Sequence, residues 1–156
     1  MKWKTRKRGS ARQIGQKFPV REKKKLPARI TKKPKIRQDA ISLLKSHIIN
    51  KFGGERFQFD EIIKRDIGRD GARFLLKHGV ERSGEGAKLL KMRISDCHEN
   101  VLELTKKHPE KYLGWYGFAL SRDGIWRVHS WVTDENNKII ETTVLRIKYF
   151  GVPERR

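Results

Sequence analysis

The sequence contains one cysteine, two methionines and no long apolar run in 156 residues. Because a single thiol, Cys97, cannot form an internal disulfide, a disulfide-stabilised scaffold is excluded and we expect a reducing, intracellular compartment. No apolar stretch approaches the roughly 18 residues that a membrane-spanning helix requires, so no membrane span is expected. Residues 1–8 are charged with no apolar segment behind them, which is unlike a secretory signal.

Acidic residues are almost missing from the first 37 positions, where Glu22 stands alone among 16 Lys and Arg. This segment therefore carries a net charge of +15 out of a total of +20, and the remaining 22 bases and 17 acids give only +5. Like charges at this density repel one another, and Pro19, Pro27 and Pro34 interrupt any helix. We therefore expect residues 1–38 to form a disordered basic arm.

Such an arm neutralises phosphates and releases their counterions, which gives salt-sensitive affinity without sequence preference. It predicts nucleic acid, DNA or RNA, as a partner, with a solubilising tail or a targeting signal as alternatives. An anionic membrane fits less well because no amphipathic helix accompanies the charge. The predicted phosphate-binding residues are the cations of the arm: Lys2, Lys4, Arg6, Lys7, Arg8, Arg12, Lys17, Arg21, Lys23, Lys24, Lys25, Arg29, Lys32, Lys33, Lys35 and Arg37.

Regular structure is predicted to begin at Asp39, where apolar residues start to recur at helical spacing up to residue 52. Two short helices are expected at 59–67 and 70–78. Residues 80–82 and 88–94 are expected as strands, with the Gly-rich turn 83–86 making a possible hairpin. This order of elements resembles a winged helix. We favour the alternative, in which the helices cover a sheet.

The second half of the chain predicts one helix followed by strands. Ser95 and Asp96 open the helix, and strands are expected at 112–120, 125–133, 138–143 and 144–150, with 151–153 ending the fold. The predicted fold class is α+β: a disordered basic arm, a helical segment, and a helix packed on an antiparallel sheet. The predicted boundaries are 1–38, 39–94 and 95–156, with the alternative that 39–156 forms one compact domain.

Three residues in the second half have the types and order of a thiol active site. Cys97 lies at a helix start, where the helix dipole stabilises a thiolate, and His129 and Glu141 follow on successive strands. An imidazole takes the thiol proton and a carboxylate orients the imidazole. We expect His129 and Glu141 to lie nearly opposite one another, with His98 and Asn100 as oxyanion candidates. The alternative is a buried apolar thiol beside an ordinary core histidine.

A metal site built from Cys97, His98 and His129 is a further alternative, but their spacing matches no common zinc pattern. We therefore expect no metal and no cofactor.

The stretches that carry a family resemblance are Cys97, Tyr116-Gly117-Phe118-Ala119, His129-Ser130-Trp131-Val132 and Glu141-Thr142-Thr143. Over residues 95–145 the chain resembles the core of transglutaminase-like and papain-like thiol proteins. Ser130, Glu141 and Thr142 stand where that family usually has Ala, Asp and Pro. The resemblance implies Cys97 as nucleophile, His129 as base and Glu141 as orienting acid of a thiol hydrolase or acyl transferase with a protein or peptide substrate. The alternative is a non-catalytic nucleic-acid-binding, ribonucleoprotein or virion component on the same scaffold.

Overall fold

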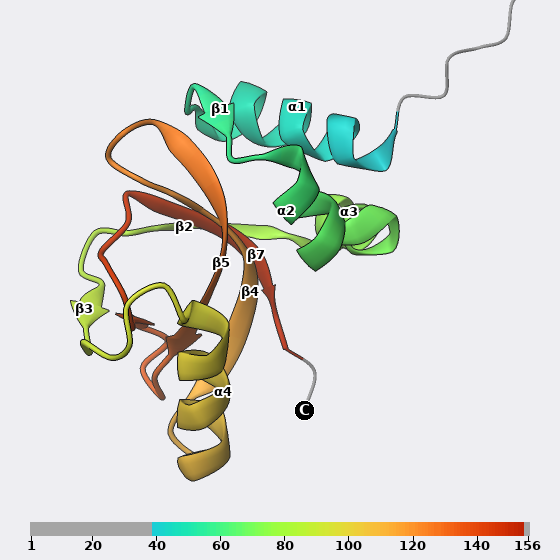
Figure 1. Ribbon diagram of the computed structural model, residues 1–156. Helices are drawn as coiled ribbons and strands as arrows, with labels where there is room; N and C mark the ends of the chain where they lie inside the picture. Colours follow the sequence, from blue (N-terminus) through green and yellow to red (C-terminus); the bar gives the residue numbers. More distant parts are fainter. Residues whose placement is uncertain (1–38, 155–156) are drawn as a thin grey trace, which may run out of the picture. The chain divides into compact units, whose positions relative to one another are not determined.

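The computed structural model describes residues 39–154 (Figure 1). The basic arm predicted for residues 1–38 lies outside the described residues. Residues 39–154 belong to one compact unit with four helices and a mixed sheet of seven strands, which confirms the predicted α+β class. No helix within these residues is long and apolar enough to cross a bilayer.

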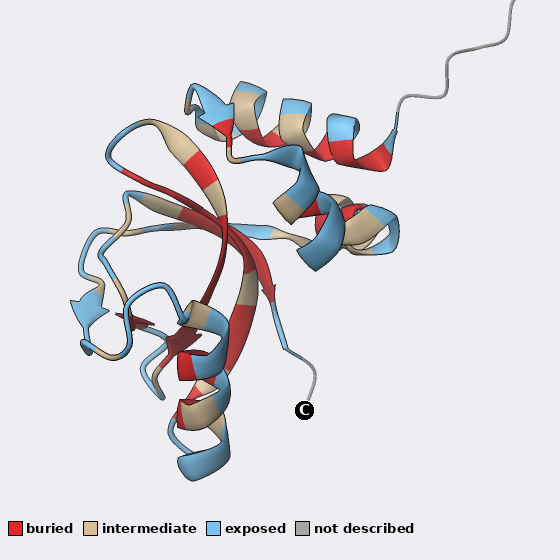
Figure 2. Ribbon diagram, in the orientation of Figure 1, coloured by how far each residue is buried: buried red, intermediate tan, exposed pale blue. Residues whose placement is uncertain are grey.

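Three helices precede the main sheet: α1 (Ala40–Phe52), α2 (Asp60–Asp66) and α3 (Gly68–His78). Their apolar residues at helical spacing, such as Leu44, Ile48 and Leu75, are completely buried. These side chains share one hydrophobic core with Phe118 and Trp126 of the sheet. Figure 2 shows the buried side of α1 and the buried central strands. The helices therefore cover the sheet, as the favoured interpretation predicts.

The strands are β1 (Arg56–Phe57), β2 (Val80–Ser83), β3 (Lys88–Leu89), β4 (Leu113–Leu120), β5 (Ile125–Thr133), β6 (Ile139–Glu141) and β7 (Lys148–Pro153). Their order in the sheet is β2-β7-β4-β5-β6-β3, and β1 pairs separately with β5. The pairs β1–β5 and β3–β6 are parallel and the others are antiparallel. The expected antiparallel sheet is therefore a mixed one.

The possible hairpin over residues 80–94 is not formed. β2 pairs with β7 and β3 pairs with β6, so the two strands lie at opposite ends of the sheet order. The wing of a winged helix needs these strands to pair with each other. The chain still turns at residues 84–87, where the Ala87 N–H donates to the Gly84 carbonyl, but the two segments pair with β7 and β6 instead of with each other.

The last strand begins later than expected. β7 starts at Lys148 and includes Gly151, Val152 and Pro153, which were expected to lie beyond the sheet. Val152 is 2% exposed, so this end of the strand contributes to the core. Residues 144–147 precede the strand and leave Val144 and Leu145 52% and 40% exposed. The apolar character of 144–147 therefore reflects a surface patch rather than a strand.

Helix α4 (Cys97–Lys107) begins at the predicted place, with Asp96 as its N-cap. Its buried Val101 and Leu104 pack against Val132 of β5 and Ile140 of β6. This packing holds the first turn of α4 beside β5, and it fixes the position of Cys97.

Candidate thiol active site

Cys97 lies beside an uncovered stretch of β5. β1 pairs with β5 at residues 125–126 and β6 pairs with it at 132–133. No described strand pairs with residues 127–131 on this side. The first turn of α4 lies here, and the backbone N–H of Ser130 hydrogen-bonds the Cys97 sulfur. Ser95, two residues before Cys97, has a φ of 67°, a conformation that non-glycine residues rarely adopt and that often marks functional sites.

His129 and Glu141 are joined across the sheet. His129 Nε2 lies 2.8 Å from Glu141 Oε2, and both side chains are almost completely buried. The pairing of Val132 with Ile140 places the two residues diagonally, two positions away from a direct pair. A diagonal neighbour is within reach of a long side chain, which explains how Glu serves at position 141.

Hydrogen-bond donors surround the Glu141 carboxylate. Oε1 accepts bonds from the backbone N–H of Thr142 and from the N–H and Oγ1 of Thr143, at 2.9 to 3.0 Å. Oε2 accepts the Tyr149 hydroxyl at 3.0 Å in addition to His129. Burial acts to raise the pKa of Glu141, but the bonds to His129 and Thr143 outweigh it and lower the pKa to about 2. The carboxylate is therefore charged at neutral pH.

The thiol of Cys97 is strongly acidified. Burial acts to raise its pKa, but hydrogen bonds with His129 and His98, the charge of His129 and the Ser130 N–H lower it to about 5. Burial acts to lower the pKa of His129, but Cys97 and Glu141 raise it above the ordinary value. Because Nε2 of His129 bonds Glu141, Nδ1 is the ring nitrogen left for the sulfur. The arrangement favours a thiolate–imidazolium pair at neutral pH.

His98 is a second imidazole at the thiol. Its Nδ1 lies 2.6 Å from Ser130 Oγ, and its ring also hydrogen-bonds Cys97. The bond with Cys97 raises the pKa of His98 against the opposing effect of burial, and the charges of Cys97 and Asp66 add to the rise. Ser130 therefore serves the site twice, through its backbone N–H and through its hydroxyl. In the family resemblance, Ser130 was noted only because it stands where Ala is usual.

Asn100, the second expected oxyanion candidate, hydrogen-bonds groups other than the thiol and the two imidazoles. It is completely buried, and its Nδ2 donates to the Arg93 carbonyl at 2.8 Å and to Thr142 Oγ1 at 3.4 Å. These bonds tie α4 to the segments on either side of the site. Asn100 does not line the cavity that opens at the thiol, in contrast to His129 and Cys97. Within residues 39–154, no group of three or more His, Cys, Asp and Glu residues could hold a metal ion.

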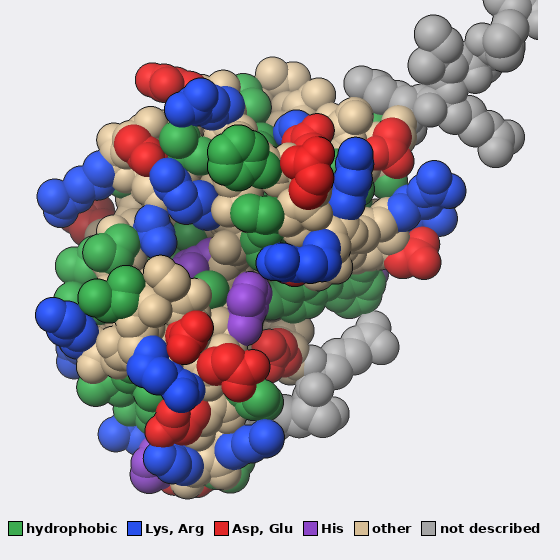
Figure 3. Space-filling view, viewed as in Figure 1, with side chains coloured by type: hydrophobic (Ala, Val, Ile, Leu, Met, Phe, Trp, Pro, Cys, Tyr) green, Lys and Arg blue, Asp and Glu red, His purple; other side chains and the backbone are tan. Residues whose placement is uncertain are grey.

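A cavity of about 830 Å³ opens onto the thiol. Its wall includes Cys97, His129 and Gln58, a residue that the sequence did not point to. The Nε2 atom of Gln58 is buried and has no hydrogen-bond partner among the described residues. β1 fixes Gln58 here, because the Gln58 N–H donates to the Trp126 carbonyl at 2.9 Å. Figure 3 shows His side chains at the surface among basic, hydrophobic and acidic groups.

The structure thus brings Cys97, His98, His129 and Glu141 together. The predicted phosphate-binding residues of the arm lie outside the described residues. No protein-family model, curated protein or solved structure matched this chain. Function is therefore argued from the site itself.

Proposed function

We propose that this protein is a thiol acyl-transfer enzyme, a hydrolase or transferase with a transglutaminase-like or papain-like core. The observation that carries the proposal is the buried relay from Glu141 through His129 to Cys97 at the start of a helix. A carboxylate that orients an imidazole, which in turn activates a thiol, is the arrangement that nucleophilic catalysis requires. A structural cysteine has no need of a low pKa.

The reaction begins when the Cys97 sulfur attacks the carbonyl carbon of an amide or ester, forming a C–S bond. The carbonyl oxygen gains negative charge, and in this proposal the donors to it are the Cys97 backbone N–H at the helix start and the side-chain amide of Gln58, whose Nε2 has no partner among the described residues. When the intermediate collapses, the C–N or C–O bond breaks and His129 gives its proton to the leaving group. Water or an amine, deprotonated by His129, then attacks the thioester and releases the thiol.

Alkylation by iodoacetamide tests the activated thiol directly, because Cys97 is the only cysteine of the chain. The rate depends on the thiolate fraction. With a pKa of about 5, the rate is expected to rise as pH increases through 5 and to be level by neutral pH. An ordinary thiol gains rate only as pH increases through about 8.5.

His129→Ala removes the imidazolium, so we expect the midpoint to move upward and the rate at pH 6 to fall about tenfold. The expected fall in rate is only about tenfold because a more basic thiolate is intrinsically more nucleophilic, which offsets part of the loss of thiolate. The urea-unfolded wild-type chain gives the reference for an unactivated thiol. A native rate profile that matches this reference would contradict the proposal.

A second proposed activity is nucleic-acid binding by residues 1–37. It rests on one observation, the 16 Lys and Arg against a single acid in this segment. Phosphate neutralisation by such a segment gives affinity without a folded recognition surface. The two proposals are independent, because neither uses residues of the other.

A further inference from the structure

The thiol cavity is continuous with two neighbouring hollows, and the three together are called the groove. A hollow of about 500 Å³ adjoins it and shares Gln58, Ile62 and Arg127 with it. Another hollow of about 480 Å³ adjoins it through Leu89, Val144 and Arg146. Space therefore continues from the thiol cavity into two further hollows, which gives room for a longer ligand than the cavity alone would hold.

Apolar side chains are concentrated along this groove. Of the ten large hydrophobic residues exposed among those described, five line the three hollows: Phe59, Leu89, Ile94, Val144 and Leu145. Phe59 is 79% exposed and Ile94 is 75% exposed. Contiguous apolar surface of this kind marks a binding site. The occupant must therefore offer apolar groups.

The charge along the groove is positive. Five cationic side chains line the three hollows, against two acidic ones, Asp60 and Asp123. Both acids already have a cation: Asp60 lies 2.7 Å from Lys45, and Asp123 lies 2.7 Å from Arg127.

Lys91 and Arg146, which line the thiol cavity itself, have no ion pair among the described residues. Arg146 donates to Ser121 Oγ, and its Nε atom is buried without a partner in the described part of the chain. Lys91 and Arg146 therefore have no negatively charged partner, and an acidic ligand would supply one.

We propose that the groove binds an extended acidic peptide segment, with a carboxylate against Lys91 and Arg146 and apolar side chains against the exposed patch. This rests on the proposed function, since Cys97 would attack a carbonyl group of that segment. The basic segment of the chain itself is a poor occupant, because its 16 cations and single acid would meet a positive groove. A second copy of this basic chain is disfavoured for the same reason.

Three matched peptides test the inference: iodoacetyl tripeptide amides with Glu, Gln or Lys between two Leu residues. Cys97 is the only thiol that they can alkylate, so the ratio of the labelling rates at Cys97 reports recognition. We expect the Glu peptide to label about tenfold faster than the Lys peptide at low salt, with the Gln peptide in between. Equal rates for the three peptides would overturn the inference.

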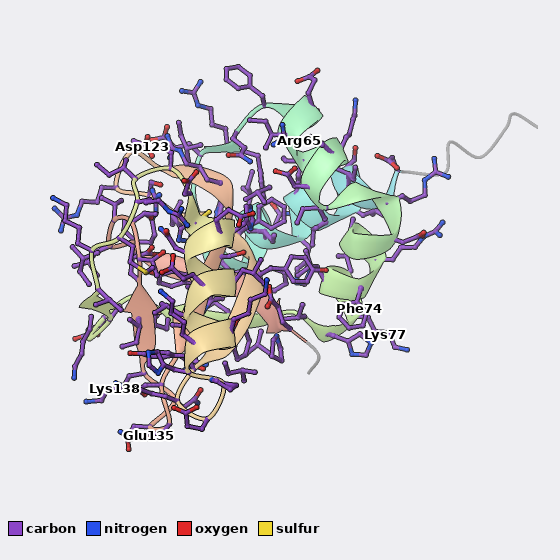
Figure 4. The ribbon with its side chains drawn as sticks, turned by 60° about the horizontal axis from the view of Figure 1, so that its bottom comes forward. Arg65, Phe74, Lys77, Asp123, Glu135 and Lys138 are labelled. Atoms are coloured by element: carbon purple, nitrogen blue, oxygen red, sulfur yellow. The ribbon has the colours of Figure 1, made fainter. Side chains whose placement is uncertain are left out.

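Lys91→Gln combined with Arg146→Gln should abolish most of this preference, when each peptide rate is divided by the iodoacetamide rate of the same variant. Lys91→Gln alone, at an exposed position, should remove part of it without any effect on folding. The control is Lys77→Gln combined with Lys138→Gln, which changes the net charge equally. Figure 4 shows both lysines on the outside of the molecule.

The control pair separates the groove from the charge of the whole chain. If it lowers the preference as much as the groove pair does, general attraction to a basic protein is the cause and the inference is wrong. Slow iodoacetamide labelling, in contrast, would count against the proposed function. A preference among the peptides that persisted in that case would still support a peptide-binding groove.

Discussion

At the scale of single residues, the Glu141 carboxylate accepts hydrogen bonds from several residues of the site. Five donors from Thr142, Thr143, Tyr149 and His129 converge on its two oxygens. A buried charge is tolerated only when its lone pairs are satisfied in this way. These donors keep the carboxylate ionised, and the ionised carboxylate raises the pKa of His129 beside the thiol.

Substitution of Gln58 permits a test that separates stabilisation of an oxyanion from activation of the thiol. Acylation by p-nitrophenyl acetate passes through an oxyanion, whereas alkylation by iodoacetamide does not. We expect Gln58→Ala to slow acylation about 10²-fold, the size reported for loss of one oxyanion donor, and to leave alkylation nearly unchanged. Formation of the acetyl-enzyme is measured by nitrophenol release and by the mass of the intact protein.

Cys97→Ser provides the background for this measurement, because it removes the only thiol. If Gln58→Ala slowed both reactions equally, Gln58 would support the shape of the cavity rather than donate to an oxyanion. If it slowed neither, its buried amide would have no part in the chemistry.

At the scale of helices and strands, the sequence predicted the elements with strong local signals. β5 occupies the predicted residues 125–133, and α4 starts where Ser95 and Asp96 indicated. The placement of Cys97 at a helix start and of His129 and Glu141 on successive strands could therefore be predicted from the sequence alone. Periodicity and turn residues carry this information because they act over a few neighbouring positions.

Strand pairing could not be predicted from the sequence in the same way. β1 and β3 have two residues each, too few to show an alternating pattern, and both pair in parallel with distant strands. Gln58 could not be predicted because β1 brings it to the site. Residues 144–147 were mistaken for a strand because their apolar side chains line the surface groove instead of a core. Local pattern misleads where apolar groups lie at the surface instead of in a core.

The helices and the sheet are expected to unfold together because they share one core. Leu75 of α3 is completely buried in it, and Trp126 Nε1 of β5 donates to the Gly53 carbonyl after α1 at 2.8 Å. Leu75→Ala should lower the free energy of unfolding by about 2–5 kcal/mol. Urea unfolding is followed by far-ultraviolet circular dichroism and by the reactivity of Cys97.

The two probes should give the same midpoint, before and after the substitution. Leu43→Ala is the matched control, since Leu43 lies on α1 but is 41% exposed, and it should change stability by less than about 0.5 kcal/mol. Loss of helical signal at a urea concentration where Cys97 stays activated would show two separate domains instead of one.

At the scale of the whole molecule, the positive charge is distributed unevenly along the chain. The segment 1–37 carries +15 of the total +20, and residues 38–156 carry the rest. Lys91 and Arg146 line the cavity that holds the thiol, where in our proposal they would select an acidic substrate. The N-terminal segment has no thiol and a single acid, Glu22, against 16 Lys and Arg, so nearly all of its positive charge is uncompensated by its own sequence. A protein of this kind would act on acidic peptides while held on a nucleic acid.

Salt dependence measures the second of these functions. Binding of the full chain to duplex DNA should weaken with salt, with a slope of log K against log salt of about −0.9 for each phosphate neutralised. Replacing Lys23, Lys24, Lys25, Lys32 and Lys33 by Gln should reduce the magnitude of that slope by up to about 4.5. Cys97→Ser should leave the slope unchanged, because the thiol site takes no part in phosphate binding. If the five replacements left affinity and slope as they were, the N-terminal cations would not be the contact, and the basic groove of the folded unit would be the next surface to neutralise.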